Sequence, residues 1–222
     1  MGVGTGQDPS SAAAKARAAQ EHYDRWASAY GRSRLLPSLQ RKAVAELSLR
    51  RDDRLLDVAC GTGAVVIQNA PLVDRAVGVD LSEGMLELAR ERLGELPEPD
   101  RPRNVDFVQG PSDALPFEDE SFTALICTTA LHHFPDPQRS IDEMARVLEP
   151  AGRVVIGDAA RDAVVSKLAD PLFRHFEEGH VGLQRKDDIA AMLERAGLHV
   201  SSSRHVWLRL YAIVRADRQP SR

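Results

Sequence analysis

The feature that most constrains this chain is a glycine turn between two short apolar segments, each of which carries a carboxylate. The first segment, Arg54–Ala59, contains Asp57 and runs into the turn Gly61-Thr62-Gly63. The second segment, Ala76–Asp80, ends in an aspartate. The order strand, glycine turn, helix, strand predicts the first half of a nucleotide-binding α/β unit, in which the backbone of the turn approaches the ligand.

The position of Asp57 narrows the choice of ligand. A carboxylate before the glycines would repel a pyrophosphate, and Val66 stands where a dinucleotide fingerprint has its third glycine. The same carboxylate suits a ligand that has no phosphate and carries an ammonium group at its nearer end, such as S-adenosylmethionine (SAM). Asp80 could accept hydrogen bonds from both ribose hydroxyls, although NAD enzymes use the same geometry.

The rest of the chain continues the alternation of strands and helices. We expect strands at Val105–Gln109, Phe122–Cys127 and Arg153–Asp158, and helices at Gly63–Ala70, Ser82–Leu93, Pro137–Leu148, Val164–Glu177 and Lys186–Arg195. Such alternation predicts a parallel sheet with right-handed crossovers. A closing antiparallel hairpin is predicted at Val200–Arg204 and Trp207–Val214, joined by a short connection at Arg204-His205.

The length of 222 residues suits one domain with a full core. We expect a disordered tail over 1–11, a helical segment over 12–50, the ligand-binding domain over 51–216 and a polar tail over 217–222.

Composition argues against several classes of protein. The net charge of −4 lacks the basic excess of a general nucleic-acid binder. No apolar run approaches the roughly 20 residues of a membrane span, and the first residues do not form a secretory signal. Two cysteines, Cys60 and Cys127, are too few for a disulfide framework or a zinc site, so we expect no metal, buried free thiols and a cytoplasmic location.

Five segments in order resemble the class I SAM-dependent methyltransferases, most closely the small-molecule branch that includes the ubiquinone/menaquinone-biosynthesis methyltransferases. The segments are Leu55–Gly63, Gly78–Ser82 with Met85 and Leu86, Gly110–Phe122, Ala130–Phe134 and Ala145–Val155. The resemblance covers about Tyr23 to Val214. It implies a Rossmann-like α/β fold: a seven-stranded, mostly parallel sheet with helices on both faces and the last strand antiparallel between the fifth and sixth. It also implies SAM as cofactor, S-adenosyl-L-homocysteine as product and a small-molecule acceptor.

The resemblance implies cofactor contacts at the ends of the first four strands. Backbone near the glycine turn would approach the methionine end of SAM, and Leu81 and Met85 would pack on the adenine. The family has glycine at the position of Ala59 and usually an acidic residue at the position of Pro111, where Ser112, Asp113 or a backbone carbonyl could replace it. The implied contacts within the domain are Asp57, Ala59, Gly61, Thr62, Gly63, Asp80, Leu81, Met85, Ser112, Asp113, Ala114 and Thr128.

His132 and His133 follow the fourth strand, at the methyl-transfer side of the site in this family. A histidine can act as a general base near neutral pH, which suits methylation of oxygen or carbon because those acceptors lose a proton. The Asn/Asp-Pro-Pro-aromatic tetrapeptide of nucleic-acid amino-methyltransferases is missing here. The pair could instead hold the loop and take no part in catalysis.

An aromatic cluster precedes the first strand. In this family such a segment often closes over SAM, so the helical segment over 12–50 is predicted to act as a lid, with Tyr23 and Tyr30 contacting the cofactor. The alternative is an amphipathic helix packed on the sheet. His175, His180 and Arg185 could line an acceptor pocket or lie on the solvated surface.

Other readings of the motifs stay open. A cyclase, isomerase or sensor that binds SAM without methylating would carry the same cofactor motifs, because fold does not determine chemistry. An NAD-dependent oxidoreductase is disfavoured by Asp57 and the missing third glycine. The sequence predicts neither the acceptor nor the oligomeric state.

Overall fold

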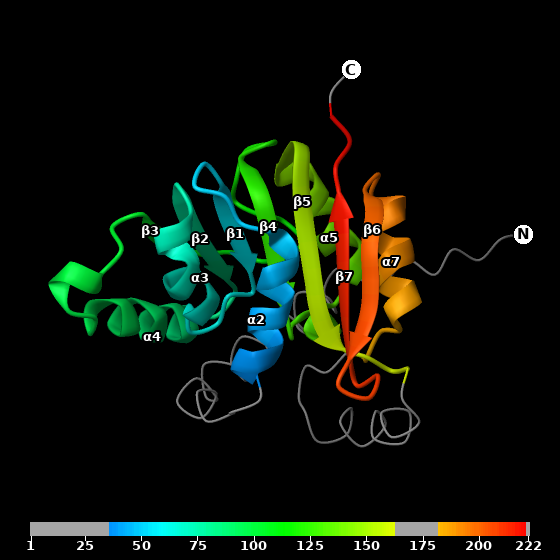
Figure 1. Cartoon of the computed structure of the whole chain (residues 1–222), viewed down its shortest axis with the longest axis horizontal. Coiled ribbons are helices and arrows are strands. Elements are labelled where there is room, and N and C mark those ends of the chain that lie inside the picture. The colour runs from blue at the N-terminus through cyan, green and yellow to red at the C-terminus, as the bar shows by residue number, and fades with distance from the viewer. Residues whose placement is uncertain (1–35, 163–181, 221–222) are drawn as a thin grey trace, which may run out of the picture.

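The computed structural model describes residues 36–162 and 182–220. Its centre is a seven-stranded sheet in the order β3-β2-β1-β4-β5-β7-β6 (Figure 1). The strands are β1 Arg54–Val58, β2 Arg75–Asp80, β3 Val105–Gln109, β4 Phe122–Thr128, β5 Leu148–Ala159, β6 His199–Val206 and β7 Tyr211–Asp217. β7 runs antiparallel to both of its neighbours, β5 and β6, and the other pairs are parallel. The predicted Rossmann-like sheet, with its last strand inserted between the fifth and sixth, is confirmed.

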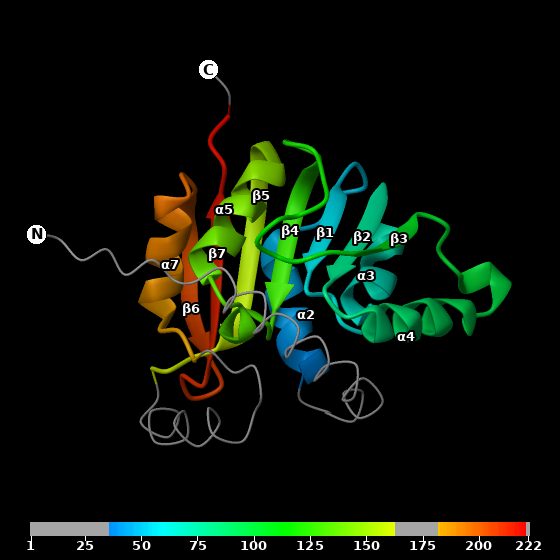
Figure 2. The ribbon, with the colours of Figure 1, turned by 180° about the vertical axis from the view of Figure 1, so that it is seen from behind.

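Helices cover both faces of this sheet, as Figures 1 and 2 show from opposite sides. They are α2 Leu36–Leu47, α3 Ala64–Asn69, α4 Glu83–Gly94, α5 Pro137–Val147 and α7 Lys186–Arg195, with short 3₁₀ turns at Ala70–Leu72, Glu98–Asp100 and Leu131–His133. α4 begins at Ser82, whose hydroxyl accepts a hydrogen bond from the Met85 N–H at 3.2 Å, the expected N-cap geometry.

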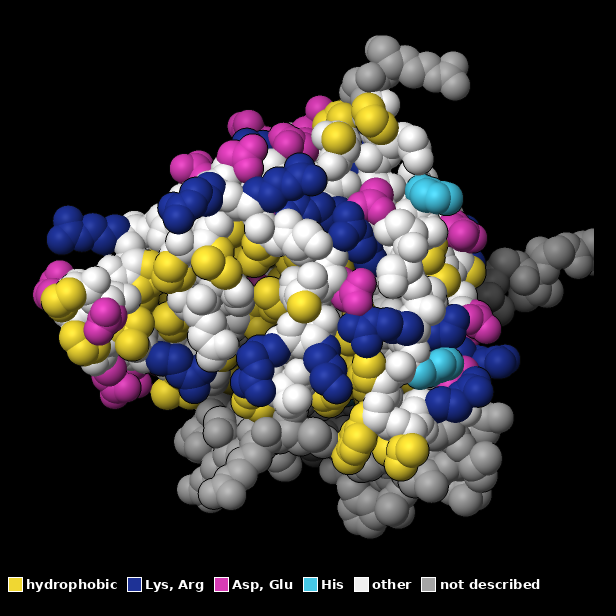
Figure 3. All heavy atoms as spheres, in the orientation of Figure 1, with side chains coloured by type: hydrophobic (Ala, Val, Ile, Leu, Met, Phe, Trp, Pro, Cys, Tyr) yellow, Lys and Arg dark blue, Asp and Glu magenta, His cyan; other side chains and the backbone are white. Residues whose placement is uncertain are grey.

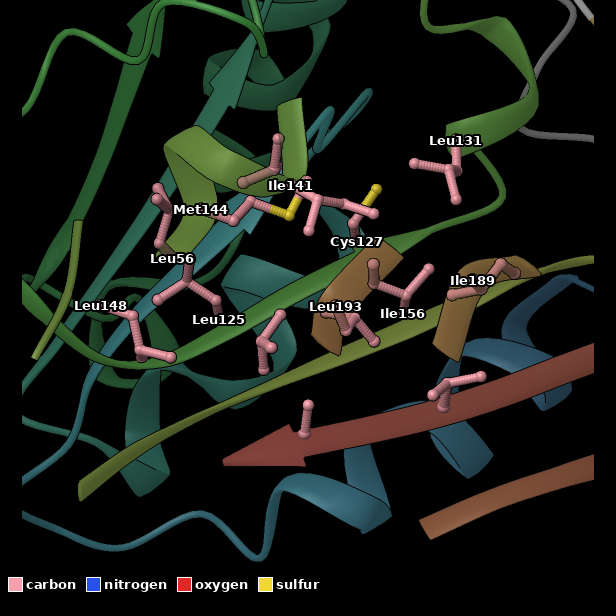
Figure 4. Packing of buried hydrophobic residues seen from close by; sticks show 14 of the residues in the cluster. Leu56, Leu125, Cys127, Leu131, Ile141, Met144, Leu148, Ile156, Ile189 and Leu193 are labelled. Carbon is pink, nitrogen blue, oxygen red and sulfur yellow. The ribbon is translucent and has the colours of Figure 1, made fainter. Parts of the chain in front are cut away.

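Alternation along the strands divides the core into two layers. Leu55 belongs to the layer that buries Leu39 and Ala43 of α2 together with residues of α3. Leu56, the next residue, belongs to the layer on the opposite face. In that second layer, side chains of α5 and α7 project toward those of β4 and β5, among them Ile141 and Ile189 (Figure 4). The sheet is therefore buried on both faces, as a parallel sheet requires.

A buried ion pair between Arg153 and Asp53 lies at the end of the sheet opposite to the site residues. Arg153 binds both carboxylate oxygens of Asp53 and also donates to the carbonyl of Leu47 at the end of α2. Both charged side chains are buried. Burial raises the pKa of Asp53, but hydrogen bonds from Arg153 and Thr123 outweigh it, so the net pKa lies below its usual value. The pair ties α2 to the sheet.

The predicted antiparallel hairpin is present, but its connection is not at Arg204-His205. β6 continues through Arg204-His205 to Val206, and the chain reverses over 207–210. Trp207, Leu208 and Arg209 adopt φ values of 50°, 54° and 67°. A reversal of this kind normally uses glycine or asparagine. Trp207 and Leu208 are apolar and therefore predict a strand, but in the structure these two residues are 52% and 85% exposed.

Other strand boundaries also differ from the sequence expectations. β5 begins at Leu148 instead of Arg153, because Leu148 already pairs with Phe122 and the predicted turn becomes an irregularity within the strand, with Ala151 at φ 63°. β7 covers Tyr211–Asp217, whereas the sequence predicted a strand at Trp207–Val214. The helix expected at Val164–Glu177 lies outside the described residues.

The surface over α2 and α3 carries charges of both signs. Figure 3 shows Lys and Arg side chains across this face with Asp and Glu side chains among them. None of the helices within 36–162 and 182–220 is long and apolar enough to cross a membrane.

Candidate active site

A cavity of about 270 Å³ opens at the carboxyl ends of the central strands. Strand β1 pairs with β2 on one side and with β4 on the other, so the order of the sheet reverses at this point. In open α/β sheets, ligands bind at such a switch point because the loops diverge there. The sequence-predicted residues that line the cavity are Ala59, Gly61, Asp80, Leu81, Met85, Ser112, Asp113, Thr128 and His133.

The glycine turn provides one wall of this cavity. Gly61 has φ 52°, and a Cβ added to it would meet no atom within 4 Å, so its backbone faces open space. Gly63 has φ 71°, but a Cβ there would lie 2.6 Å from the Phe107 ring. Gly61 therefore leaves room for a ligand, whereas Gly63 is required for packing against β3. Ala59 keeps the left-handed backbone, with φ 58°, that the family's glycine would adopt more easily.

Asp80 is held in place by two backbone N–H groups. Gly61 N–H donates to Asp80 Oδ2 at 2.8 Å, and Ser82 N–H donates to Oδ1 at 3.0 Å. A carboxylate oxygen can accept more than one hydrogen bond, which is the property that binding of ribose hydroxyls requires. The carboxylate is thus fixed at the cavity wall before any ligand arrives.

Asp57 is a buried carboxylate that does not line the cavity itself. It is 2% exposed and stands two residues before Ala59, which does line the cavity. Its Oδ1 atom has no hydrogen-bond partner among the described residues. Burial, and then the charge of Asp80, raises the pKa of Asp57 well above its usual value. A carboxylate in this position favours a cationic group nearby.

The part of the cavity wall where the adenine is expected contains Leu81, Met85 and the segment after β3. Pro111, which replaces the usual acidic residue, lies in the wall beside Ser112 and Asp113. The Ser112 hydroxyl is 2.9 Å from the Ser140 hydroxyl of α5. Ala114 is exposed and is not part of the wall.

Several predicted site residues lie elsewhere. Arg92 of α4 donates to both the carbonyl and the hydroxyl of Thr62, at 3.0 and 2.9 Å, so this hydroxyl is engaged outside the cavity. Tyr23 and Tyr30, like His175 and His180, lie outside the described residues. Arg185 is described; its side chain is 60% exposed and lies 3.7 Å from Asp162.

The two histidines take different positions. His133 lines the cavity, whereas His132 is buried and does not. Asp158, at the end of β5, accepts hydrogen bonds from the His132 backbone N–H at 2.9 Å and from its ring Nδ1 at 2.7 Å. The two imidazole ring centroids are 3.8 Å apart. Sequence reasoning did not select Asp158, although a carboxylate at the carboxyl end of a strand was an available signal.

The wall near the histidines also contains polar residues that the sequence did not identify. Gln40 of α2 lines the cavity and donates from Nε2 to the Thr128 hydroxyl at 3.4 Å. Thr129 lines it too, with a strained φ of 56°, and its hydroxyl lies 3.3 Å from the Tyr211 hydroxyl. These contacts join segments far apart in the chain, so no local motif indicates them.

The cysteines are buried or half-buried thiols. Cys60 lines the cavity and Cys127 is in the core. Burial raises the pKa of both thiols well above the usual value, which keeps them protonated and poorly nucleophilic. In the part of the chain that the structure describes, no group of three His, Cys, Asp or Glu side chains could hold a metal ion.

Comparison with known proteins points to one family. Residues 56–156 match the model of the methyltransferase domain family. The chain is 36% identical to a demethylmenaquinone methyltransferase of Clavibacter sepedonicus, over 60% of this chain and 55% of that protein. It is 34% identical to the 27-O-demethylrifamycin SV methyltransferase of Amycolatopsis mediterranei, over 72% of this chain and 59% of that protein.

The methyltransferase YcgJ of Bacillus subtilis is similar in both sequence and structure. It is 35% identical over 60% of this chain and 51% of its own length. Its crystal structure superposes with a TM-score of 0.70, covering 83% of this chain and 99% of YcgJ, at 21% identity in the structural alignment. The matched sequence thus spans little more than half the length of these curated relatives.

The residues present fit SAM. The unpartnered Asp57 oxygen suits its ammonium group, the fixed Asp80 carboxylate suits its ribose, and Leu81 and Met85 suit its adenine. The match to the methyltransferase domain and its relatives agrees with this fit. Residues 56–156 thus match a methyltransferase domain, the chain resembles the class I SAM-dependent methyltransferases, and its site fits S-adenosyl-L-methionine as cofactor.

Proposed function

We propose that the protein transfers a methyl group from SAM to an oxygen or carbon atom of a small-molecule acceptor. The observation that carries this proposal is the histidine corner: His133 on the cavity wall, with its ring centroid 3.8 Å from that of His132, which Asp158 holds. Acceptors that bind through oxygen or an acidic carbon lose a proton on methylation, and this corner offers a base for it.

The cofactor-binding residues have separate roles in the proposal. Asp80 holds the ribose, Leu81 and Met85 hold the adenine, and Ser112 or Asp113 replaces the usual acidic contact to the adenine amino group. Asp57 balances the ammonium charge at the other end. When bound, SAM supplies an electrophilic methyl group on its sulfonium. No covalent enzyme intermediate is needed, so positioning of the two reactants provides much of the catalysis.

The base is one of the two histidines. His133 is the one that lines the cavity and can reach a bound acceptor. His132 is held by Asp158 through Nδ1, so Nε2 is the unprotonated nitrogen of the neutral ring. The acceptor loses its proton at this corner, and replacing each histidine separately shows which ring receives it.

The acceptor class is inferred from relatives. The two named relatives are methyltransferases of demethylmenaquinone and of 27-O-demethylrifamycin SV, which are small molecules. We infer an acceptor of comparable type. The lid predicted over 12–50, with Tyr23 and Tyr30 at the cofactor, is proposed only for the part before α2, because α2 packs on the sheet. The cytoplasmic location, which two free cysteines favour, also belongs to this proposal.

Two measurements test the function. Isothermal titration with SAM and with NAD should show binding of SAM alone. Phenols, quinols and amines are then screened with methyl-labelled SAM, and we expect label in phenols or quinols. Methyl transfer to amines alone would contradict the proposal that a histidine removes a proton from an oxygen or carbon acceptor. Tight SAM binding without methyl uptake by any class would instead support a cyclase, isomerase or sensor on the same fold.

A further inference from the structure

Two carboxylates lie on adjacent strands beside the expected cofactor site. Asp57 on β1 and Asp80 on β2 lie on adjacent parallel strands, with Asp57 opposite Gly78 in the register. Both oxygens of Asp80 accept backbone hydrogen bonds, and Asp80 lies in the cavity wall. Asp57 is 2% exposed, and its Oδ1 atom has no partner among the described residues.

Among the described residues, no positively charged group is found to act on the Asp57 carboxyl. Asp80 is the charged group that acts on its carboxyl, and it does so repulsively. The thiols of Cys60 and Cys127 face the same region from the glycine turn and from β4, and both are protonated. Arg90 of α4 acts on Cys60 but forms an ion pair with Glu83 at 2.7 Å, with its side chain 46% exposed. Gln40, which α2 contributes to the cavity wall, is neutral.

A buried carboxyl with an open oxygen and a neighbouring carboxylate is more stable in its neutral form. The balance reverses when a cation comes within a few ångströms, because attraction between opposite charges in a buried site exceeds the cost of ionisation. The ammonium group of SAM or of S-adenosyl-L-homocysteine is such a cation.

We propose that Asp57 carries a proton in the free protein and releases it to solvent when the ammonium group of the cofactor binds. Binding at this site is then an exchange of one cation for another: the ammonium keeps its three hydrogens, and the carboxyl loses its O–H proton. The inference rests on SAM as the cofactor and is independent of the acceptor and of methyl transfer.

The exchange has a consequence for ligand selection. While Asp57 is protonated in the free protein and the ligand ammonium is charged, affinity should rise by up to about tenfold per pH unit. A nucleoside without an ammonium group cannot displace the proton. Such ligands, including adenosine and dinucleotides, would leave the site with a neutral Asp57 and gain nothing from it.

Proton release can be counted by calorimetry. S-adenosyl-L-homocysteine is titrated into the full chain at about pH 6, where its ammonium is charged, in buffers of different ionisation enthalpy. The slope of the observed enthalpy against the buffer enthalpy gives the protons released. We expect about one proton per bound ligand. As a ligand control, 5′-methylthioadenosine has the nucleoside and the thioether but no ammonium, and it should release close to none.

Variants separate Asp57 from other titrating groups. Asp57→Asn should bind S-adenosyl-L-homocysteine with no proton release, and its affinity should be nearly independent of pH in the same range. Proton release by Asp57→Asn equal to that of the wild type would overturn the assignment, as would zero release by the wild type. Should Asp57→Asn fail to fold, the comparison of the two ligands on the wild-type protein decides: equal release by both overturns the proposal.

Discussion

Asp158 accepts two hydrogen bonds from a single residue, His132: one from the backbone N–H at 2.9 Å and one from the ring Nδ1 at 2.7 Å. Both side chains are buried. Because a carboxylate only accepts, Nδ1 carries the hydrogen and Nε2 is left as an acceptor. The contact therefore sets the tautomer and the orientation of a ring whose plane is tilted by 45° against that of His133 in the cavity wall.

Replacing Asp158 by asparagine should test this contact. The amide can donate to Nδ1, which favours the tautomer with hydrogen on Nε2 and removes the acceptor. Once an acceptor is known, we expect Asp158→Asn to lower the methyl-transfer rate by about 100-fold, with cofactor affinity nearly unchanged. The matched control is Asp162→Asn, since Asp162 pairs with His205 at 2.9 Å outside the cavity wall. An equal loss in both variants would indicate a general effect on folding.

The two histidines should be replaced separately. If one of them is the base, His132→Ala or His133→Ala should lower the rate by at least about 100-fold while SAM affinity stays nearly intact. Activity of the wild type should fall on the acid side, because an imidazolium cannot accept a proton. Near-normal rates across pH in both variants would show that positioning alone drives the reaction and that the pair is structural.

Asp80 should dominate recognition of the ribose. Asp80→Ala removes an acceptor that two backbone N–H groups hold in place, and it should weaken SAM binding by about 1.5–3 kcal/mol, roughly 10- to 150-fold. Isothermal titration measures the affinity, and thermal unfolding shows whether the turn has lost stability. An unchanged affinity would refute the ribose assignment.

The two glycines of the turn should respond differently to alanine. Both have positive φ, so each substitution costs about 1–2 kcal/mol of stability. At Gly63 the new methyl would also press on Phe107, which should add about 1–3 kcal/mol to the loss. At Gly61 it would enter open space beside the cavity, so cofactor affinity should fall while the extra loss of stability is absent. Thermal unfolding and titration of both variants make the comparison.

The free protein should lose stability as pH rises above the ordinary carboxyl range. The folded-state pKa of Asp57 is raised, so its contribution is fully present below the unfolded pKa of about 3.9 and is lost as pH passes the folded value. Asp53 acts in the opposite sense, because its lowered pKa gives stability that is lost only in acid. Melting temperature against pH above about pH 5 should therefore fall in the wild type and stay flatter in Asp57→Asn. Parallel curves would contradict a raised Asp57 pKa.

The order of elements and the cofactor could be predicted because their signals are local. One α/β unit is specified by three local features: the apolar run of β1, the glycine turn and the carboxylate at the end of β2. Each acts through backbone conformation and short-range packing. The right-handed crossover then leaves few topologies open. The prediction of the hairpin connection was wrong because its local signal is missing. Trp207 and Leu208 reverse the chain without the glycine or asparagine that normally marks a turn.

The sequence by itself determined the fold class, the order of the strands and the group of residues at the glycine turn. Only the tertiary structure decided which polar side chains meet. Gln40 reaches Thr128, Thr129 reaches Tyr211 and Asp158 reaches His132 across separations of 88, 82 and 26 residues. The physical reason is that such contacts depend on strand register and helix packing over the whole sheet, which no local pattern records. Burial acts in the same way, since only the assembled core deprives Asp57 of solvent and so changes the chemistry of its carboxyl.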